Sequence, residues 1–79
     1  MSEYILYGTD GCHLCEDAQL VLADCAVDYQ YQDIMQQEIW QQRYGLLIPV
    51  LCHEPTQQQL NWPFTAEQVR QIFREDYAG

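Results

Sequence analysis

Residues 4–15 read YILYGTDGCHLC, and they carry the strongest structural signal in the sequence. Its apolar, aromatic-rich start over residues 4–7 is typical of a buried strand that ends at Gly8, and residues 9–11 form a predicted turn. From Cys12 onward, apolar side chains recur with the period of an amphipathic helix, at Leu14, Ala18, Val21, Leu22 and Cys25. Cys12 and Cys15 therefore open a predicted helix directly after a predicted strand and turn.

The motif Cys12-His13-Leu14-Cys15 is the candidate reactive site. Two intervening residues at the start of a helix bring the sulfurs close enough to bond, and the free backbone N–H groups of the first turn can stabilise a thiolate. We expect Cys12, nearer the exposed end, to be the nucleophile, and Cys15, one turn into the helix and shielded, to resolve the mixed disulfide. A Cys-x-x-Cys pair is a weak signal alone, but it is a strong one at the start of the helix of a βαβ unit.

The middle of the chain continues an α/β pattern. Alternating apolar and polar residues predict a strand over residues 27–32 with one buried face. Residues 35–44 have a second, weaker helical pattern, with Gly45 as its expected left-handed cap. Residues 46–52 are almost continuously apolar, which is typical of a central strand.

The last part of the chain supplies a hairpin and a helix. Residues 54–56 predict a turn, and residues 58–62 a short edge strand. Thr65 and Gln68 have the spacing of a capping box, which opens a last helix. The predicted order is β-α-β-α-β-β-α, with the first two strands parallel and the last two in a hairpin. This is an α/β fold with a four-stranded mixed sheet and helices on both faces.

Length and charge restrict the function classes. At 79 residues the chain is predicted to be one domain, residues 1–79. A domain of this size buries only about 60% of its unfolded surface, so the ten aromatic residues matter to its core. The formal charge of −9 disfavours binding to nucleic acid or to anionic lipid, and it favours basic partner surfaces and a soluble monomer.

Two features indicate the compartment. The longest apolar run, residues 46–52, contains Pro49 and is too short to cross a bilayer, and no signal peptide is visible at the start of the sequence. We therefore expect a cytoplasmic protein. In that reducing environment, a close pair of cysteines is more often catalytic or metal-binding than structural.

Three segments resemble one known family. Residues 7–15 resemble the active-site segment of the glutaredoxin-like branch of the thioredoxin superfamily, and Tyr44-Gly45-Leu46 followed by Ile48-Pro49-Val50 resembles that superfamily's approach to its cis-proline. The segment Trp62-Pro63-Phe64-Thr65 is similar to one in short bacterial glutaredoxin-like proteins. The resemblance implies a thioredoxin-like fold with a redox-active centre.

The resemblance also implies a substrate site. It predicts a cis Ile48–Pro49 bond that packs beside Cys12, with the backbone N–H and C=O of Ile48 pairing with a bound peptide or thiol. His13 and Leu14, between the two cysteines, are the other expected substrate-binding residues. Pro55 and Pro63 are interpreted as turn prolines.

The chain departs from typical glutaredoxins where these bind glutathione. They usually read Cys-Pro-Tyr-Cys, whereas this chain has His13 and Leu14 between its cysteines, and it has no lysine at all. Residues 61–64, Asn-Trp-Pro-Phe, stand where glutaredoxins have a Gly-Gly stretch. The usual glutathione-binding residues are thus absent, and we expect no cofactor; glutathione stays open as a ligand that these residues do not support.

The leading hypothesis is thiol–disulfide exchange with protein or low-molecular-weight disulfides, which would make the chain an oxidoreductase. Two alternatives stay open. Cys12, His13 and Cys15 supply soft ligands for a metal-handling protein, although one chain lacks a second pair to close a zinc site. The fold could also serve as a non-catalytic interaction module. His13 either lowers the pKa of Cys12 as a cation or is simply an exposed residue at the helix start.

The other notable side chains are interpreted structurally. Cys25 and Cys52 are expected to be core thiols, and His53 is expected to lie in a turn. Trp40 and Trp62 are predicted to pack in the core. The three basic residues, Arg43, Arg70 and Arg74, are expected to be solvated or paired with helix carboxylates.

Overall fold

The computed structural model describes residues 3–78 of the chain, with side chains described through residue 72. Its elements follow the predicted order, with one 3-10 helix added before the second α-helix. In sequence they are β1 (Tyr4–Gly8), α1 (His13–Asp24), β2 (Tyr29–Asp33), η1 (Ile34–Gln36), α2 (Glu38–Tyr44), β3 (Val50–His53), β4 (Gln58–Asn61) and α3 (Ala66–Ala78).

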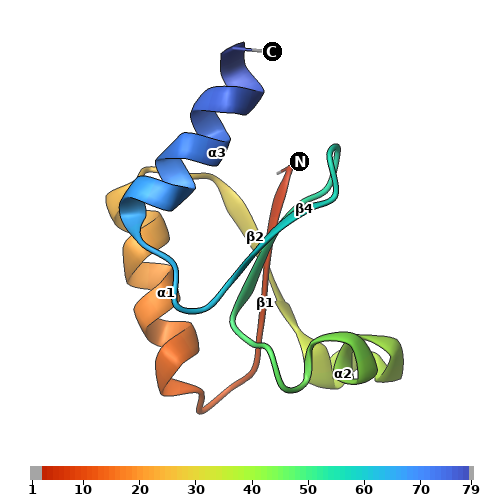
Figure 1. Cartoon of the computed structure of the whole chain (residues 1–79). Coiled ribbons are helices and arrows are strands. Elements are labelled where there is room, and N and C mark those ends of the chain that lie inside the picture. The colour runs from red at the N-terminus through yellow and green to blue at the C-terminus, as the bar shows by residue number, and fades with distance from the viewer. Residues whose placement is uncertain (1–2, 79) are drawn as a thin grey trace.

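The four strands form one mixed sheet in the order β2-β1-β3-β4. β1 pairs in parallel with β2, so that Tyr4 lies opposite Tyr29, and it pairs antiparallel with β3. β3 and β4 form the antiparallel hairpin. Figure 1 shows α1 and α3 on one face of the sheet and α2 on the other. The predicted mixed sheet with helices on both faces is therefore confirmed.

Alternation along β1 divides the apolar side chains between two cores. Tyr4 and Leu6 belong to the cluster under α1 and α3, together with Ala18, Leu22, Val27, Leu51, Phe64 and Val69. Ile5 and Tyr7 face the other cluster, which also contains Ile34, Tyr44, Val50, Cys52, Trp40 and Ile48. Burial on both faces explains why residues 4–7 are apolar without interruption.

The region between α2 and β3 differs from the prediction. Gly45 caps α2 in the right-handed helical region (φ −53°), because the chain tightens there and the N–H groups of Leu47 and Ile48 both donate to the carbonyl of Tyr44. β3 begins only at Val50, four residues later than expected, and Leu46 and Leu47 are exposed. The apolar run over residues 46–52 is thus part loop and part strand.

The second helix is also split, because Asp33 starts a separate turn. The Asp33 carboxylate accepts a hydrogen bond from the Met35 N–H at 2.9 Å and caps η1. The α-helix begins after Gln37, whose backbone is extended. The predicted helix over residues 35–44 is therefore a 3-10 turn followed by a shorter α-helix.

His53 lies in β3 and not in a turn, and its side chain is only 2% exposed. Its ring contacts Tyr4 with a centroid distance of 4.7 Å. Nδ1 lies 2.8 Å from the Thr56 hydroxyl, and Nε2 lies 3.3 Å from a Glu3 carboxylate oxygen. These partners satisfy the buried ring, so a polar residue is tolerated in the strand.

The last helix is fixed at its start and against α1. The predicted capping box is confirmed, since the Thr65 N–H donates to Gln68 Oε1 at 2.8 Å and the Gln68 N–H donates to the Thr65 hydroxyl at 3.2 Å. Arg70 pairs with Asp24 of α1 at 3.5 Å. Pro63, interpreted as a turn proline, follows a cis Trp62–Pro63 bond in the segment that leads to this cap.

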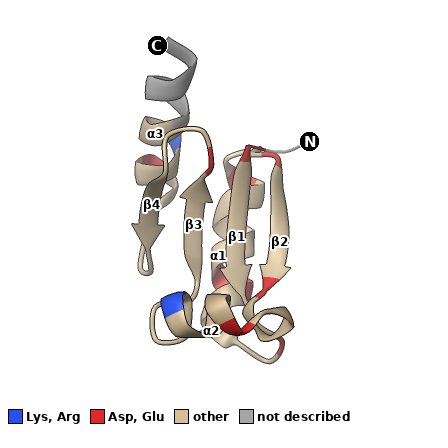
Figure 2. Cartoon of the chain, turned by 90° about the vertical axis from the view of Figure 1, so that its right-hand side faces the viewer, with Lys and Arg blue, Asp and Glu red and all other residues tan. Residues whose placement is uncertain are grey.

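The surface carries few positive charges. Figure 2 shows Asp and Glu on several elements and little Lys or Arg, in line with 12 acidic and three basic residues in the sequence. Within residues 3–78, no helix has the length and apolar character needed to cross a membrane.

Candidate active site

The two cysteines lie where β1 ends and α1 begins, at the lower end of the sheet in Figure 1. The connection turns sharply at Gly11, whose φ of +75° is in the region that favours glycine. Cys12 is the N-cap of α1 with an extended backbone, and Cys15 lies in the first turn of the helix. The local sequence thus places both sulfurs at the N-terminus of one helix.

Cys12 and Cys15 are joined by a disulfide, with their Cα atoms 5.2 Å apart. The Cys15 N–H donates to Cys12 Sγ at 3.2 Å, and the Glu16 N–H donates to the Cys12 carbonyl at 3.2 Å. A backbone donor aimed at the sulfur, together with the positive end of the helix dipole, favours the thiolate form of Cys12 after reduction.

The two sulfurs differ in their access to solvent. Cys15 is 1% exposed, whereas Cys12 is half-buried at the surface. A thiol that attacks an external disulfide must be reachable, while a thiol that attacks its neighbour need not be. The geometry therefore suits an outer cysteine that meets a substrate and an inner cysteine that meets only Cys12.

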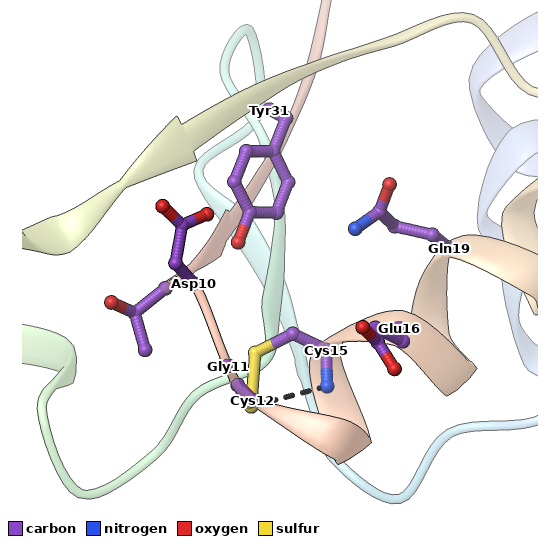
Figure 3. A pocket seen from close by; sticks show the side chains of 8 residues that line it. Asp10, Gly11, Cys12, Cys15, Glu16, Gln19 and Tyr31 are labelled. Carbon is purple, nitrogen blue, oxygen red and sulfur yellow. Dashed lines mark hydrogen bonds between the residues drawn. A yellow bond between two sulfur atoms is a disulfide. The ribbon is translucent and has the colours of Figure 1, made fainter.

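A pocket of about 340 Å³ opens beside the disulfide. Figure 3 shows its labelled side chains, which come from the turn, from α1 and from β2. Two exposed carboxylates, Asp10 and Glu16, flank the sulfurs. The lining residues are Thr9, Asp10, Gly11, Cys12, Cys15, Glu16, Gln19 and Tyr31.

Tyr31 belongs to this pocket, although no motif in the sequence predicts it there. Its strand runs parallel to β1, with Leu6 opposite Tyr31, so the carboxyl ends of both strands point toward the start of α1. The pKa of Tyr31 is raised, first by burial and then by the nearby carboxylates of Asp33 and Asp10 and by Tyr29. The parallel βαβ unit was the signal that could have found it, because it brings the ends of the two strands to one edge.

The residues between the cysteines lie outside the pocket lining. His13 is 93% exposed, and its Nδ1 lies 3.7 Å from a carboxylate oxygen of Glu16. Leu14 is about half exposed. Of the two interpretations of His13, its exposure agrees with a solvated residue at the start of the helix.

Ile48 and Pro49 lie in the loop before β3, and neither lines the pocket beside the disulfide. The bond between them is cis. Pro49 is fully buried, and Ile48 packs half-buried against the core under α2. Their expected contact with a substrate stays a prediction.

The other two cysteines, Cys25 and Cys52, have raised pKa values and are poor nucleophiles. Burial raises the pKa of Cys52, which lies within the second core, and nearby Glu54 raises it further. Burial also raises the pKa of Cys25, whose thiol donates to the Ala66 carbonyl at 3.5 Å. In the part of the chain that the structure describes, no group of three or more His, Cys, Asp or Glu side chains could hold a metal ion.

The sheet, the helices on both faces and the Cys-x-x-Cys pair at the start of α1 together define a thioredoxin-like α/β fold. The family described as glutaredoxin-like domain (DUF836) matches residues 3–74. The X-ray structure of target protein XcR50 from X. campestris is 34% identical, with a TM-score of 0.82, over 91% of this chain and 96% of that one. The chain therefore belongs to the glutaredoxin-like (DUF836) family.

Two further comparisons agree with the fold. The solution structure of XcR50 from X. campestris also has 34% identity and a TM-score of 0.82, covering 95% of both chains. The solution structure of protein Ne2328 from Nitrosomonas europaea has a TM-score of 0.69 over 90% of this chain and 89% of that one. At 20% identity it supports the fold alone. The comparison with curated proteins finds no match.

Proposed function

We propose that this protein is a thiol–disulfide oxidoreductase in which Cys12 is the nucleophile and Cys15 the resolving cysteine. The observation that carries the proposal is the pairing of a reachable sulfur and a buried sulfur, within bonding range, at the N-terminus of α1. Family membership supports a redox-type fold for the same segment.

The proposed reaction has two exchange steps. The Cys12 thiolate attacks one sulfur of a substrate disulfide, a Cys12–substrate disulfide forms, and the first substrate thiolate leaves. The Cys15 thiolate then attacks Cys12 Sγ, the Cys12–Cys15 disulfide forms, and the second substrate thiolate leaves. The substrate gains two electrons, the protein dithiol loses two, and the thiolates take up protons from water.

We propose protein or low-molecular-weight disulfides as the substrates. The backbone of Ile48, beside Pro49, would pair with an extended substrate, and His13 and Leu14 would border it. Asp10 and Glu16 support a preference for neutral or cationic groups next to the scissile disulfide, because like charges repel an anionic substrate. Glutathione carries a net negative charge, so it fits this site less well than a cationic disulfide.

The experiment is single-turnover reduction of a neutral aromatic disulfide by the fully reduced protein. We expect Cys12→Ser to abolish the reaction, and Cys15→Ser to stop it at a mixed disulfide on Cys12, identified by peptide mass. Cys25→Ser is the matched control and should react like the unmodified protein. If Cys12→Ser keeps full activity, Cys12 is not the nucleophile.

A further inference from the structure

Gly8, the last residue of β1, has no side chain, and two other side chains border the space that one would occupy. A methyl group built on Gly8 would lie 2.8 Å from the Tyr31 hydroxyl oxygen and 3.0 Å from Cys15 Sγ. The two atoms therefore border the same small space, and they are no farther apart than the sum of these distances. Figure 3 shows the Tyr31 ring extending from β2 with its hydroxyl toward the disulfide.

In the disulfide form, the Tyr31 hydroxyl is a donor with no acceptor in the described part of the chain. Within residues 3–72, no protein group accepts a hydrogen bond from it. Tyr29, two residues earlier on the same strand, differs in this respect, because its hydroxyl donates to Gln19 Oε1 at 3.4 Å. Cys15 Sγ borders the same space as the Tyr31 hydroxyl, and this sulfur becomes a strong acceptor once it is a thiolate.

The proposed reaction requires Cys15 to lose its proton in surroundings that disfavour a thiolate. Cys15 must be a thiolate to attack Cys12, yet its side chain is almost completely buried, and burial raises the pKa of a thiol. The carboxylates of Asp10 and Glu16 lie along the same pocket and also disfavour a second negative charge there. Some neutral donor is needed that remains protonated near neutral pH.

We propose that the Tyr31 hydroxyl donates a hydrogen bond to the Cys15 thiolate of the reduced protein and so promotes the resolving step. This inference rests on the proposed function and adds Tyr31 to its site. The Cys15 proton leaves to solvent through the pocket, and the Tyr31 proton stays on its oxygen throughout. The Cys12–substrate bond then breaks as the Cys12–Cys15 bond forms.

The charged groups around Tyr31 are consistent with this role. Asp10 from the turn and Glu16 from α1 line the pocket with Tyr31, and Asp33 and Tyr29 of β2 act on it electrostatically. Burial, followed by Asp33, Asp10 and Tyr29, raises the pKa of Tyr31, so the phenol remains a donor over the range in which a thiol titrates. Cys12, the other titratable group, carries no charge while it is in the mixed disulfide.

The test compares Tyr31→Phe with Tyr29→Phe, the matched control on the same strand. In the Cys12→Ser background, the pKa of Cys15 is followed by thiolate absorbance. We expect Tyr31→Phe to raise it by about one pH unit, because one hydrogen bond to a charged group is lost. Tyr29→Phe should leave it within a few tenths of a unit.

The pH profile of the resolving step separates this role from a structural one. A more basic thiolate is more nucleophilic, with a Brønsted slope of about 0.4–0.5, so Tyr31→Phe should slow resolution about threefold at neutral pH. At a pH above the Cys15 pKa of both proteins, Tyr31→Phe should resolve the mixed disulfide at least as fast as the unmodified protein. A loss of rate that is equal at every pH would overturn the inference.

The two proposals fail in different ways. The rate of Cys12 attack is measured in the Cys15→Ser background and should change less than twofold on Tyr31→Phe. If Cys12 attacks normally but Tyr31→Phe and Tyr29→Phe give the same Cys15 pKa, Tyr31 has no such role and the oxidoreductase proposal stands. If no mixed disulfide forms on Cys12 in any background, the proposed function itself is wrong.

Discussion

The two ends of α1 each present a cysteine, and only one end is suited to thiol chemistry. At the N-terminus, Cys12 accepts a backbone hydrogen bond and pairs with Cys15 beside an open pocket. At the C-terminus, Cys25 is the C-cap, and its thiol donates to the Ala66 carbonyl of the neighbouring segment. Cys12 therefore lies at the positive end of the helix dipole, and Cys25 lies at the negative end.

Burial strengthens this contrast. The pKa of Cys25 is raised mainly by burial and further by Asp24, while Arg70 acts in the opposite direction. Arg70 is paired with Asp24, so its charge is shared with a carboxylate. We therefore expect the reactivity of a cysteine to depend on its place on the helix and not on sequence spacing alone.

The largest expected effect is on thiol reactivity. When the fully reduced protein is treated with a small alkylating agent at neutral pH, Cys12 should react about a hundredfold faster than Cys25 or Cys52. The helix N-terminus stabilises the Cys12 thiolate, whereas burial raises the pKa of the other two thiols. Peptide mass analysis over time gives the three rates. Equal rates at Cys12 and Cys25 would remove the distinction between the two helix ends.

The next effect concerns the packing under the N-terminal end. Gly8→Ala should destabilise the protein by about 1–3 kcal/mol, because the added methyl group collides with Tyr31 and Cys15. Chemical denaturation measures the free energy of unfolding. Tyr31→Phe in the same chain should recover part of that loss by removing the hydroxyl, whereas Tyr29→Phe should recover nothing. An unchanged stability of Gly8→Ala would show that the three groups are not in contact.

A smaller effect should come from the charges of the pocket. We expect a cationic disulfide such as cystamine to be reduced about five- to tenfold faster than a dicarboxylate disulfide at low salt, with the ratio falling as salt screens the charges. Asp10→Asn and Glu16→Gln should each lower this ratio. Glu38→Gln, on α2, is the control and should leave it unchanged. A ratio near one in the unmodified protein would contradict the proposed charge preference.

The smallest effect belongs to the C-terminal end of the helix. Cys25→Ala should cost about 1 kcal/mol of stability through the lost hydrogen bond to Ala66 and lost packing, and Cys25→Ser should cost less because a hydroxyl can still donate. Thermal or chemical unfolding of both variants measures this. Neither substitution should alter the rate of single-turnover reduction. A change in that rate would show that Cys25 takes part in the reaction, which contradicts the account.

Features that depend on neighbours in sequence could be predicted from it. The helix that starts after Cys12, the capping box at Thr65 and the order of the elements all follow from local patterns. The sequence also identified Cys12 and Cys15 as one pair, because a short spacing on a helix fixes their separation.

Features that depend on contacts between distant segments were missed or misread. Tyr31 and Cys15 border the same space beside Gly8 only because β2 aligns in parallel with β1 in one particular register. His53 was interpreted as a turn residue, since a histidine between a strand and Glu54-Pro55 looks exposed, but Tyr4 and Glu3 at the other end of the chain cover it. Leu46 and Leu47 look like strand residues by composition, yet hydrogen bonds from the Leu47 and Ile48 N–H groups to the Tyr44 carbonyl hold this segment in a loop.

The most direct test of the account is an equilibrium redox titration, in which the Cys12–Cys15 disulfide is quantified by mass after alkylation of free thiols. A reversible two-electron transition at about −200 to −270 mV would place the pair among catalytic dithiols. A midpoint below about −300 mV, as structural disulfides have, or the absence of any intramolecular disulfide between these two cysteines, would contradict it.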